Sequence, residues 1–106
     1  MADDFDYKQF DEIIHSRIRL LIMSVLTTVE EADFTFIRDR VKTTDGNLSI
    51  HLRKLEDAGY VSMKKSFIGR KPVTTYRLTA KGRRAFEIYL ERIEKLIEKI
   101  KPEKGT

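Results

Sequence analysis

The chain has 106 residues, of which 41% are hydrophobic and 36% charged, a balance typical of one globular domain. No apolar run approaches the ~18 residues of a membrane-spanning helix, and the acidic N-terminus lacks the pattern of a signal peptide, so we expect a cytoplasmic protein. Because the sequence contains no cysteine, it excludes disulfides, thiol nucleophiles and thiolate metal sites.

The net charge of +4 is unevenly distributed along the chain. Residues 38–84 hold thirteen basic and four acidic residues, whereas residues 1–12 hold five acidic residues and one lysine. Positive charge concentrated in one segment indicates a surface that binds a polyanion, although a charged stretch can also be only a solvated face.

Two helices are predicted in the first part of the chain. Between residues 11 and 29, apolar side chains recur at steps of three and four residues, and Ser16 is placed to cap a helix within this range. Residues 30–33 are predicted to form a loop. Thr35 is then expected to cap a second, shorter helix that ends at Val41.

A third helix is predicted to begin at Thr44 or Asp45 and to stop at Gly59, because glycine readily adopts the left-handed conformation that ends helices. Asp45 suits the positive end of the helix dipole and is interpreted as a cap, since a carboxylate would repel a nearby phosphate. One face of this helix is apolar and carries Leu48, Leu52 and Leu55.

The opposite face of the third helix is polar except for one aliphatic residue. At 100° per residue, the side chains that point to this face are Gly46, Ile50, Arg53 and Asp57, flanked by Asn47 and Lys54. Asparagine and arginine can each bond a base edge at two points, and an aliphatic group can contact a thymine methyl, so the face suits a DNA major groove. Ser49, at the side, can bond a phosphate or its own backbone. The simpler alternatives are that Ile50 is an exposed aliphatic of no consequence and that Gly46 only loosens the helix start.

Residues 60–78 are rich in β-branched and aromatic side chains and predict a hairpin with the sequence IGRKP at its tip. Arg70 and Lys71 at the tip have the reach to contact phosphates or a minor groove. Lys64 and Lys65 point to opposite faces of the first strand, so at most one can face DNA, and Lys64 is included in the predicted site. Alternatively, these charges only keep the hairpin edge from pairing with another strand.

A last helix is predicted from Ala80 to about Ile100, capped by Thr79 and ended by a lysine and a proline. Its apolar residues repeat at steps of four, three, four and three, as in a coiled-coil seam, and are Phe86, Leu90, Ile93, Ile97 and Ile100. The first half of this seam can equally pack within the chain, but its far end lies about 25 Å from the helix start, beyond the cover of so small a core. We therefore expect the seam to bind a second copy of the chain, with Ile14 and Ile18 of the first helix adding to the contact.

The predicted order of helix, helix, short turn, helix, hairpin and long helix describes a winged helix, mainly α with a small β-hairpin wing. The runs DGNLSIHLRKLEDAGYV and KKSFIGRKPVTTYRLTAKGRRAF resemble the small single-domain winged-helix transcriptional regulators of the ArsR/MarR-like group. The resemblance covers about residues 14–90. It implies one domain over residues 1–106. Within this domain, a helix-turn-helix at about 35–58 would enter the major groove, and a wing at about 60–78 would contact the flanking backbone. A helix at about 80–100 would form the dimer. The expected function is that of a homodimeric regulator that binds double-stranded DNA at an inverted-repeat operator.

Metal-sensing regulators of that group carry clusters of cysteine, histidine and carboxylate, and this chain has no such cluster. Its two histidines, His15 and His51, are interpreted as packed, hydrogen-bonded core residues, so we expect no metal and no other cofactor and leave any effector open. No set of catalytic residues is recognisable either, so an enzyme is not expected. The alternative is a winged-helix module that docks proteins in a larger transcription assembly, against which the base-reading chemistry of Asn47 and Arg53 favours DNA.

Overall fold

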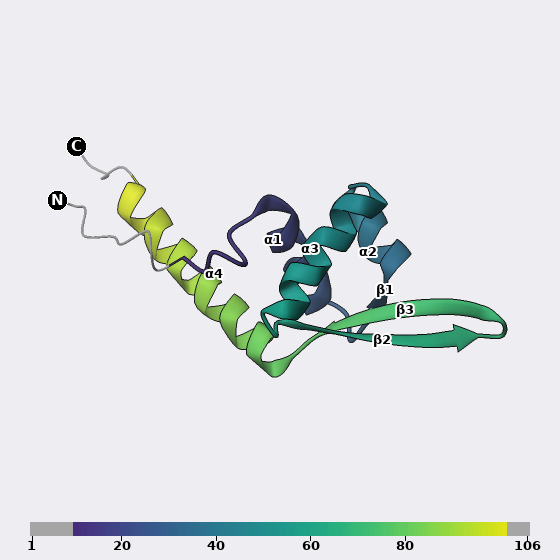
Figure 1. Cartoon of the computed structure of the whole chain (residues 1–106). Helices are drawn as coiled ribbons and strands as arrows, with labels where there is room; N and C mark the ends of the chain where they lie inside the picture. The colour runs from purple at the N-terminus through teal and green to yellow at the C-terminus, as the bar shows by residue number, and fades with distance from the viewer. Residues whose placement is uncertain (1–9, 102–106) are drawn as a thin grey trace.

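The structure, a computed structural model, describes residues 10–101 (Figure 1). Within this range the elements are α1 (Arg17–Thr27), β1 (Ala32–Asp33), α2 (Phe34–Val41), α3 (Asp45–Asp57), β2 (Val61–Ile68), β3 (Lys71–Leu78) and α4 (Ala80–Ile100). The strands form one antiparallel sheet in the order β1-β3-β2. This arrangement is a winged helix, and it confirms the predicted fold class.

Side-chain caps fix where the helices begin. Ser16, Thr44 and Thr79 each accept a hydrogen bond from the backbone N–H three residues further on. Ser16 and Thr79 were predicted as caps, and Thr44 was one of two residues at which α3 was expected to begin. The predicted cap of α2 is wrong. Asp33 caps that helix instead of Thr35, because its carboxylate accepts a 2.8 Å bond from the third N–H and starts the helix two residues earlier.

The predicted loop at residues 30–33 is also partly wrong, because it contains the short strand β1. Ala32 pairs with Tyr76 and Asp33 with Thr75 of β3. A strand of two residues is too short to show the alternation by which strands are recognised in a sequence. Its pairing joins the start of α2 to the wing and holds the helix-turn-helix against the hairpin.

The core is built from one face of each helix together with the inner ends of the strands. The α3 leucines lie inside it, as predicted: Leu48, Leu52 and Leu55 are at most 2% exposed. Three predicted dimer contacts lie inside it too: Ile14 is 0%, Ile18 6% and Phe86 5% exposed. This corrects their assignment to a dimer interface, because periodicity identifies the apolar face of a helix but not the element that covers it.

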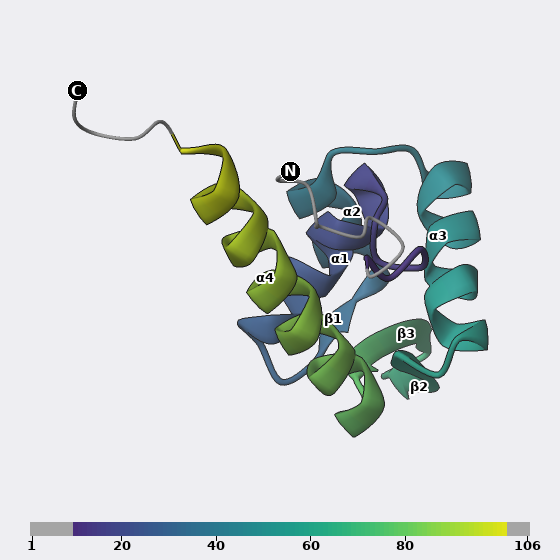
Figure 2. The same ribbon diagram turned by 90° about the vertical axis from the view of Figure 1, so that its left-hand side faces the viewer.

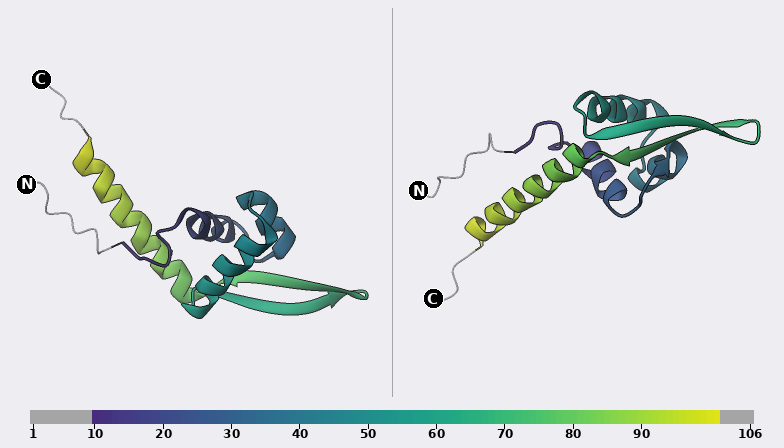
Figure 3. Two further views of the ribbon diagram at one scale, coloured as in Figure 1. Left: turned by 45° about the horizontal axis from the view of Figure 1, so that its top comes forward. Right: turned by 90° about the horizontal axis from the view of Figure 1, so that it is seen from below.

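The wing and α4 leave the body in opposite directions (Figures 1 and 3). The start of α4 is packed tightly against the start of β2. The backbone N–H of Thr79 donates a 3.1 Å bond to the Tyr60 carbonyl, and the Thr79 hydroxyl donates one of 2.6 Å to the Gly59 carbonyl. Gly59 has a φ of 81°, the left-handed conformation expected of the residue that stops α3. The end of α3, the start of the wing and the start of α4 therefore meet at this junction.

Candidate nucleic-acid interface

Helix α3 lies at one side of the molecule, with α1, α2 and α4 all on its other side (Figure 2). Its outward face is accessible along its length. The six α3 residues of the predicted site are all exposed, and they are Gly46, Asn47, Ser49, Ile50, Arg53 and Lys54. Ile50, opposite the buried leucines, is 57% exposed. The face therefore presents an amide, a guanidinium, an ammonium and one aliphatic group to the outside, with the exposed carboxylate of Asp57 at its C-terminal end.

Two details of this face suit close approach by a ligand. A Cβ atom added to Gly46 would have no neighbour within 4 Å, so the glycine leaves the backbone of the first turn open to the outside. The Arg53 Nε lies 3.8 Å from the Asp57 carboxylate, a loose pair between exposed side chains. Because such exposed pairs contribute little, the guanidinium can exchange this contact for another at small cost.

The N-terminus of α3 is tied to α2 by an ion pair. Arg38 Nη1 donates a 2.8 Å hydrogen bond to Asp45 Oδ1, and this bond is the main reason that the pKa of Arg38 is raised. The interpretation of Asp45 as a cap is wrong, because Thr44 caps the helix. Asp45 is instead paired with a cation, which reduces the repulsion that its carboxylate would exert on a phosphate. Arg38 was not predicted from the sequence, because its contact with Asp45 depends on the angle between the two helices.

A second hydrogen-bonded group holds α3 from the side of α1. Arg19 Nη1 lies 2.9 Å from His51 Nδ1, and Arg19 Nε donates to the carbonyl of Ile13. Since arginine can only donate, His51 accepts through Nδ1 and carries its single proton on Nε2. Burial, followed by the charges of Arg19 and Lys54, lowers the pKa of His51 below its ordinary value. His51 is thus half-buried and hydrogen-bonded, close to the expectation.

His15 differs from the expectation in one respect. Its Nδ1 lies 2.7 Å from the Tyr89 hydroxyl and its ring stacks on Phe10, with centroids 5.1 Å apart. The predicted hydrogen bonding is therefore confirmed. The predicted core position is wrong, because His15 is exposed at the surface, where it joins the N-terminal segment to α4.

The two faces of the wing have different neighbours. Lys65 pairs with Thr74, and both line a shallow groove against Ser49 and Arg53 of α3. Lys64 points to the other face, where it lines a hollow together with Glu31 and Arg77. The predicted alternation is confirmed, but the choice of lysine is corrected. Lys65, and not Lys64, lies on the face of the hairpin that is turned toward α3. Alternation alone does not show which face of a hairpin turns toward α3.

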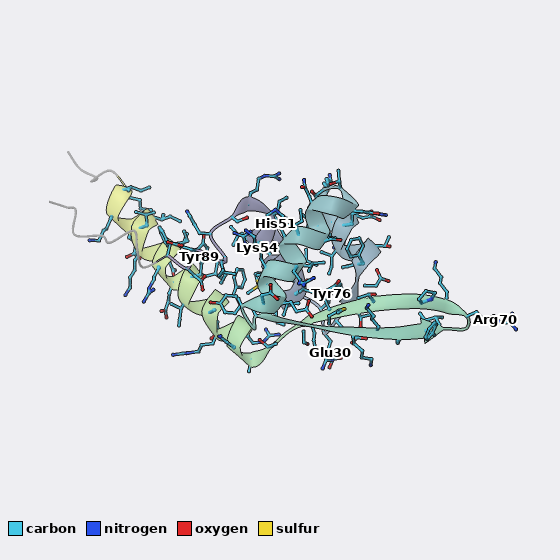
Figure 4. The ribbon with its side chains drawn as sticks, in the orientation of Figure 1. Glu30, His51, Lys54, Arg70, Tyr76 and Tyr89 are labelled. Carbon is cyan, nitrogen blue, oxygen red and sulfur yellow. The ribbon has the colours of Figure 1, made fainter. Side chains whose placement is uncertain are left out.

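The wing ends in a two-residue turn, Gly69–Arg70, between the paired residues Ile68 and Lys71. Gly69 has a φ of 65°, which glycine adopts without strain and which the first position of a type II′ hairpin turn requires. Arg70 extends outward from the end of the wing (Figure 4). Arg70 and Lys71, the cations predicted at the tip, therefore lie at the end of the hairpin that points away from the body of the domain.

The described residues contain neither a metal-binding cluster nor a membrane-spanning helix. Among residues 10–101, no group of three or more histidine, cysteine or carboxylate side chains is placed to hold a metal ion. No helix in this range is long and apolar enough to cross a membrane. The exposed face of α3 and the adjoining wing are thus the strongest candidate site of the described chain.

A three-helix core, an exposed polar face on α3 and a basic hairpin wing define a winged-helix domain of the type that binds DNA. Residues 18–97 match the family described as winged helix DNA-binding domain, and the chain belongs to this family.

Relatives of the chain agree with this assignment. An uncharacterised protein of Methanocaldococcus jannaschii is 38% identical over 89 residues, which are 84% of this chain and 97% of that protein. A transcriptional regulator homologue from Pyrococcus horikoshii has a similar structure, with a TM-score of 0.81 and 29% identity over 87% of this chain and 91% of its own. A MarR-family transcriptional regulator from Silicibacter pomeroyi has a TM-score of 0.58 and 16% identity over 85% of this chain and 62% of its own, a likeness in fold alone. The resemblance to winged-helix transcriptional regulators is confirmed.

Proposed function

We propose that this protein is a cytoplasmic transcriptional regulator that binds an inverted-repeat operator in double-stranded DNA as a homodimer, with α3 in the major groove. The observation that carries the proposal is the composition of the exposed α3 face. Asn47 and Arg53 have the side chains that read adenine and guanine edges, and Ile50 between them can contact a thymine methyl. A helix face that contacts only solvent has no requirement for an amide, a guanidinium and an aliphatic side chain at these positions.

The proposal divides the site into residues that read bases and residues that hold the backbone. Asn47 and Arg53 belong to the first group, because they lie on the outward face of the helix. Lys65 lies beside α3, while Arg70 and Lys71 lie at the wing tip, where they reach the flanking phosphates. Reading residues determine which sequence is preferred, and holding residues determine affinity for any sequence.

Titration of duplex DNA at 50 and 200 mM salt tests the first part of the proposal. If the dimer neutralises about six phosphates, affinity should fall about a thousand-fold over this range. Asn47→Ala and Arg53→Ala should each cost roughly 1–3 kcal/mol on a duplex selected by the wild type from a random pool, and should relax the preference. Arg70→Ala combined with Lys71→Ala should weaken all sequences about equally. If the wild type binds no duplex at 50 mM salt, the proposal is refuted and the protein-docking alternative is favoured.

The proposed homodimer rests on the outer half of α4. Leu90 and Ile97 are each 47% exposed and Ile100 is 68% exposed, so the predicted seam continues past the point where the core covers it. Ile93, between them, is partly buried against the chain's own core. A row of exposed apolar residues at heptad spacing is stabilised by pairing with a second helix of the same kind.

Leu90→Glu combined with Ile97→Glu tests this pairing, because both residues are exposed and the substitutions leave the core unchanged. The dimer should dissociate, and binding to the selected duplex should fall far more than binding to random DNA, since two joined half-sites supply the specific affinity. Glu91→Gln combined with Glu98→Gln is the matched control, with the same spacing on the neighbouring exposed face. Solution mass and DNA titration should be measured on the same sample. A wild-type monomer at tens of micromolar would exclude the dimer.

A further inference from the structure

The end of the wing carries two adjacent large apolar side chains that the proposed function does not use. Phe67 and Ile68 are each 71% exposed, more than any other large hydrophobic residue in the described chain. Single exposed apolar residues are common. Two consecutive ones make the end of a projecting hairpin an exposed apolar patch, which indicates an interaction site. Phe67 and Ile68 were not predicted as a site, because β-branched and aromatic residues indicate a strand but not which of its side chains stay exposed.

The register of the hairpin places the two side chains on opposite faces of the tip. Phe67 lies opposite Pro72, and Ile68 lies opposite Lys71. Because directly opposed residues share a face, Phe67 and Pro72 continue the face of Lys65, the side that faces α3. The tip is therefore apolar on both faces, with Arg70 at its end.

The charge around the patch indicates the chemistry of its partner. Residues 58–86 contain eight basic residues and no acidic residue. Along the hairpin the apolar pair is flanked only by cations, while Asp33 of β1 lines a hollow with Lys71 and Pro72. Such a basic, apolar tip suits a polyanion with apolar surface between its charges, which describes the sugars and base edges of a DNA groove. Phe67 also continues the face that Lys65 shares with α3, so one duplex can contact α3 and this side of the tip.

The length of the wing fits this partner. The strand from Met63, which lines the α3 groove, to Ile68 spans five residues, or roughly 17 Å at the usual strand rise. The minor groove that flanks a major groove lies about half a helical turn away, or about 17 Å along B-DNA. With α3 in the major groove, the tip therefore reaches the neighbouring minor groove.

We propose that Phe67 and Ile68 form an apolar wedge that enters the minor groove beside each half-site, partly unstacks a base step and bends the duplex. Arg70 and Lys71 bind the phosphates on either side of the wedge. Side chains inserted in this way bend DNA by roughly 20–90°. This inference rests on the proposed function, because it requires α3 to lie in the adjacent major groove.

The test compares two wing variants on a duplex that the wild type selects from a random pool. The bend is measured by energy transfer between dyes at the duplex ends, and unstacking by 2-aminopurine fluorescence in the flanking minor-groove segment. Phe67→Ala combined with Ile68→Ala should abolish the bend and the fluorescence change, and should weaken binding about ten-fold, since losing one base–aromatic contact has an effect of this order. Its salt slope should remain that of the wild type, because no charge is lost. Arg70→Ala combined with Lys71→Ala should instead reduce the salt slope by about 1 for each phosphate contact removed.

Three outcomes would overturn the wedge. One is a wild type that binds the duplex without bending it, and another is an alanine variant that binds within two-fold of the wild type with the same bend. Both leave the proposed function intact, because the wild type still binds specifically. The third is a change in the solution mass of the DNA-free protein in the Phe67/Ile68 variant, which would assign the patch to self-association. Thermal melting of each variant is the control for folding, and it should not change, because both side chains lie outside the core.

Discussion

Gly46 and Gly82 occupy similar places, in the first turns of α3 and α4, but have opposite surroundings. A Cβ on Gly82 would lie 2.1 Å from the carbonyl oxygen of Tyr60 and 2.8 Å from its carbonyl carbon. These are backbone atoms, so they cannot rotate out of the way. A Cβ on Gly46 would meet no atom within 4 Å. Replacing each glycine with alanine should therefore change stability in opposite directions.

The expected magnitudes follow from two terms. Alanine improves helix propensity over glycine by up to ~1 kcal/mol, less in a first turn, so Gly46→Ala should stabilise the protein by about 0.5 kcal/mol. At Gly82 the same gain is outweighed by overpacking, which costs about 1–3 kcal/mol or more. Moving α4 away from Tyr60 would also strain the Thr79–Tyr60 backbone bond, worth about 1 kcal/mol. We therefore expect Gly82→Ala to destabilise the protein by about 2 kcal/mol.

Urea unfolding followed by circular dichroism measures both changes. Protein concentration must be the same for all samples, because the stability of a dimer depends on it. The midpoint should rise for Gly46→Ala and fall for Gly82→Ala, with little change in the slope of free energy against urea. A Gly82→Ala protein as stable as the wild type would refute the reasoning, because it would mean that α4 does not pack against Tyr60 as closely as the structure shows.

Three further predictions concern the groups that support the site. Folding lowers the pKa of His51, so the neutral ring contributes stability at pH values above 6.5, the ordinary pKa of histidine. This contribution is lost as the pH falls below 6.5. The urea midpoints of the wild type and His51→Gln should therefore converge in acid. Burial and the hydrogen bond to Asp11 raise the pKa of Tyr60 to about 12. The absorbance of its phenolate should therefore appear about two pH units above that of a free tyrosine. The stability that the neutral hydroxyl contributes should be lost as the pH rises from 10 toward 12. Tyr60→Phe should remove this late step and cost about 1 kcal/mol in urea unfolding at neutral pH. Arg38→Ala should leave the urea midpoint nearly unchanged, because its pair with Asp45 is exposed. It should still weaken binding to every duplex, because the Asp45 carboxylate is then unpaired near the phosphates.

The features predicted correctly from the sequence depend on local interactions. Ser16 and Thr79 were identified as caps because each bonds a backbone group only three residues away. Asp33 was missed because a second capping residue, Thr35, lies close to it, and the pairing of β1 with β3, a contact between distant parts of the chain, favours the earlier start. Periodicity gave the apolar face of each helix in the same local way.

The rest of the site depends on contacts between distant parts of the chain. Alternation showed that Lys64 and Lys65 face opposite ways, but only the position of α3 shows that Lys65 is the one beside Arg53. Arg19 and Arg38 support α3 from other helices, through bonds to His51 and Asp45 that span 32 and 7 residues. A sequence pattern contains no information on such angles and distances between elements.

The two halves of α4 have different surroundings, and this division would couple the proposed dimer contact to the proposed DNA interface. The first half is fixed to the body, because Gly82 lies against Tyr60 and Phe86 is buried in the core. From Leu90 onward the helix is largely exposed. In the proposed homodimer this outer half binds its partner, so the helix joins the dimer contact to the junction of α3 and the wing without a flexible linker. The angle at which two α4 helices cross then determines the separation of the two α3 helices, which must be about 34 Å to match successive major grooves. Any ligand or substitution that changes the crossing angle should therefore change operator affinity without touching a DNA-contacting residue.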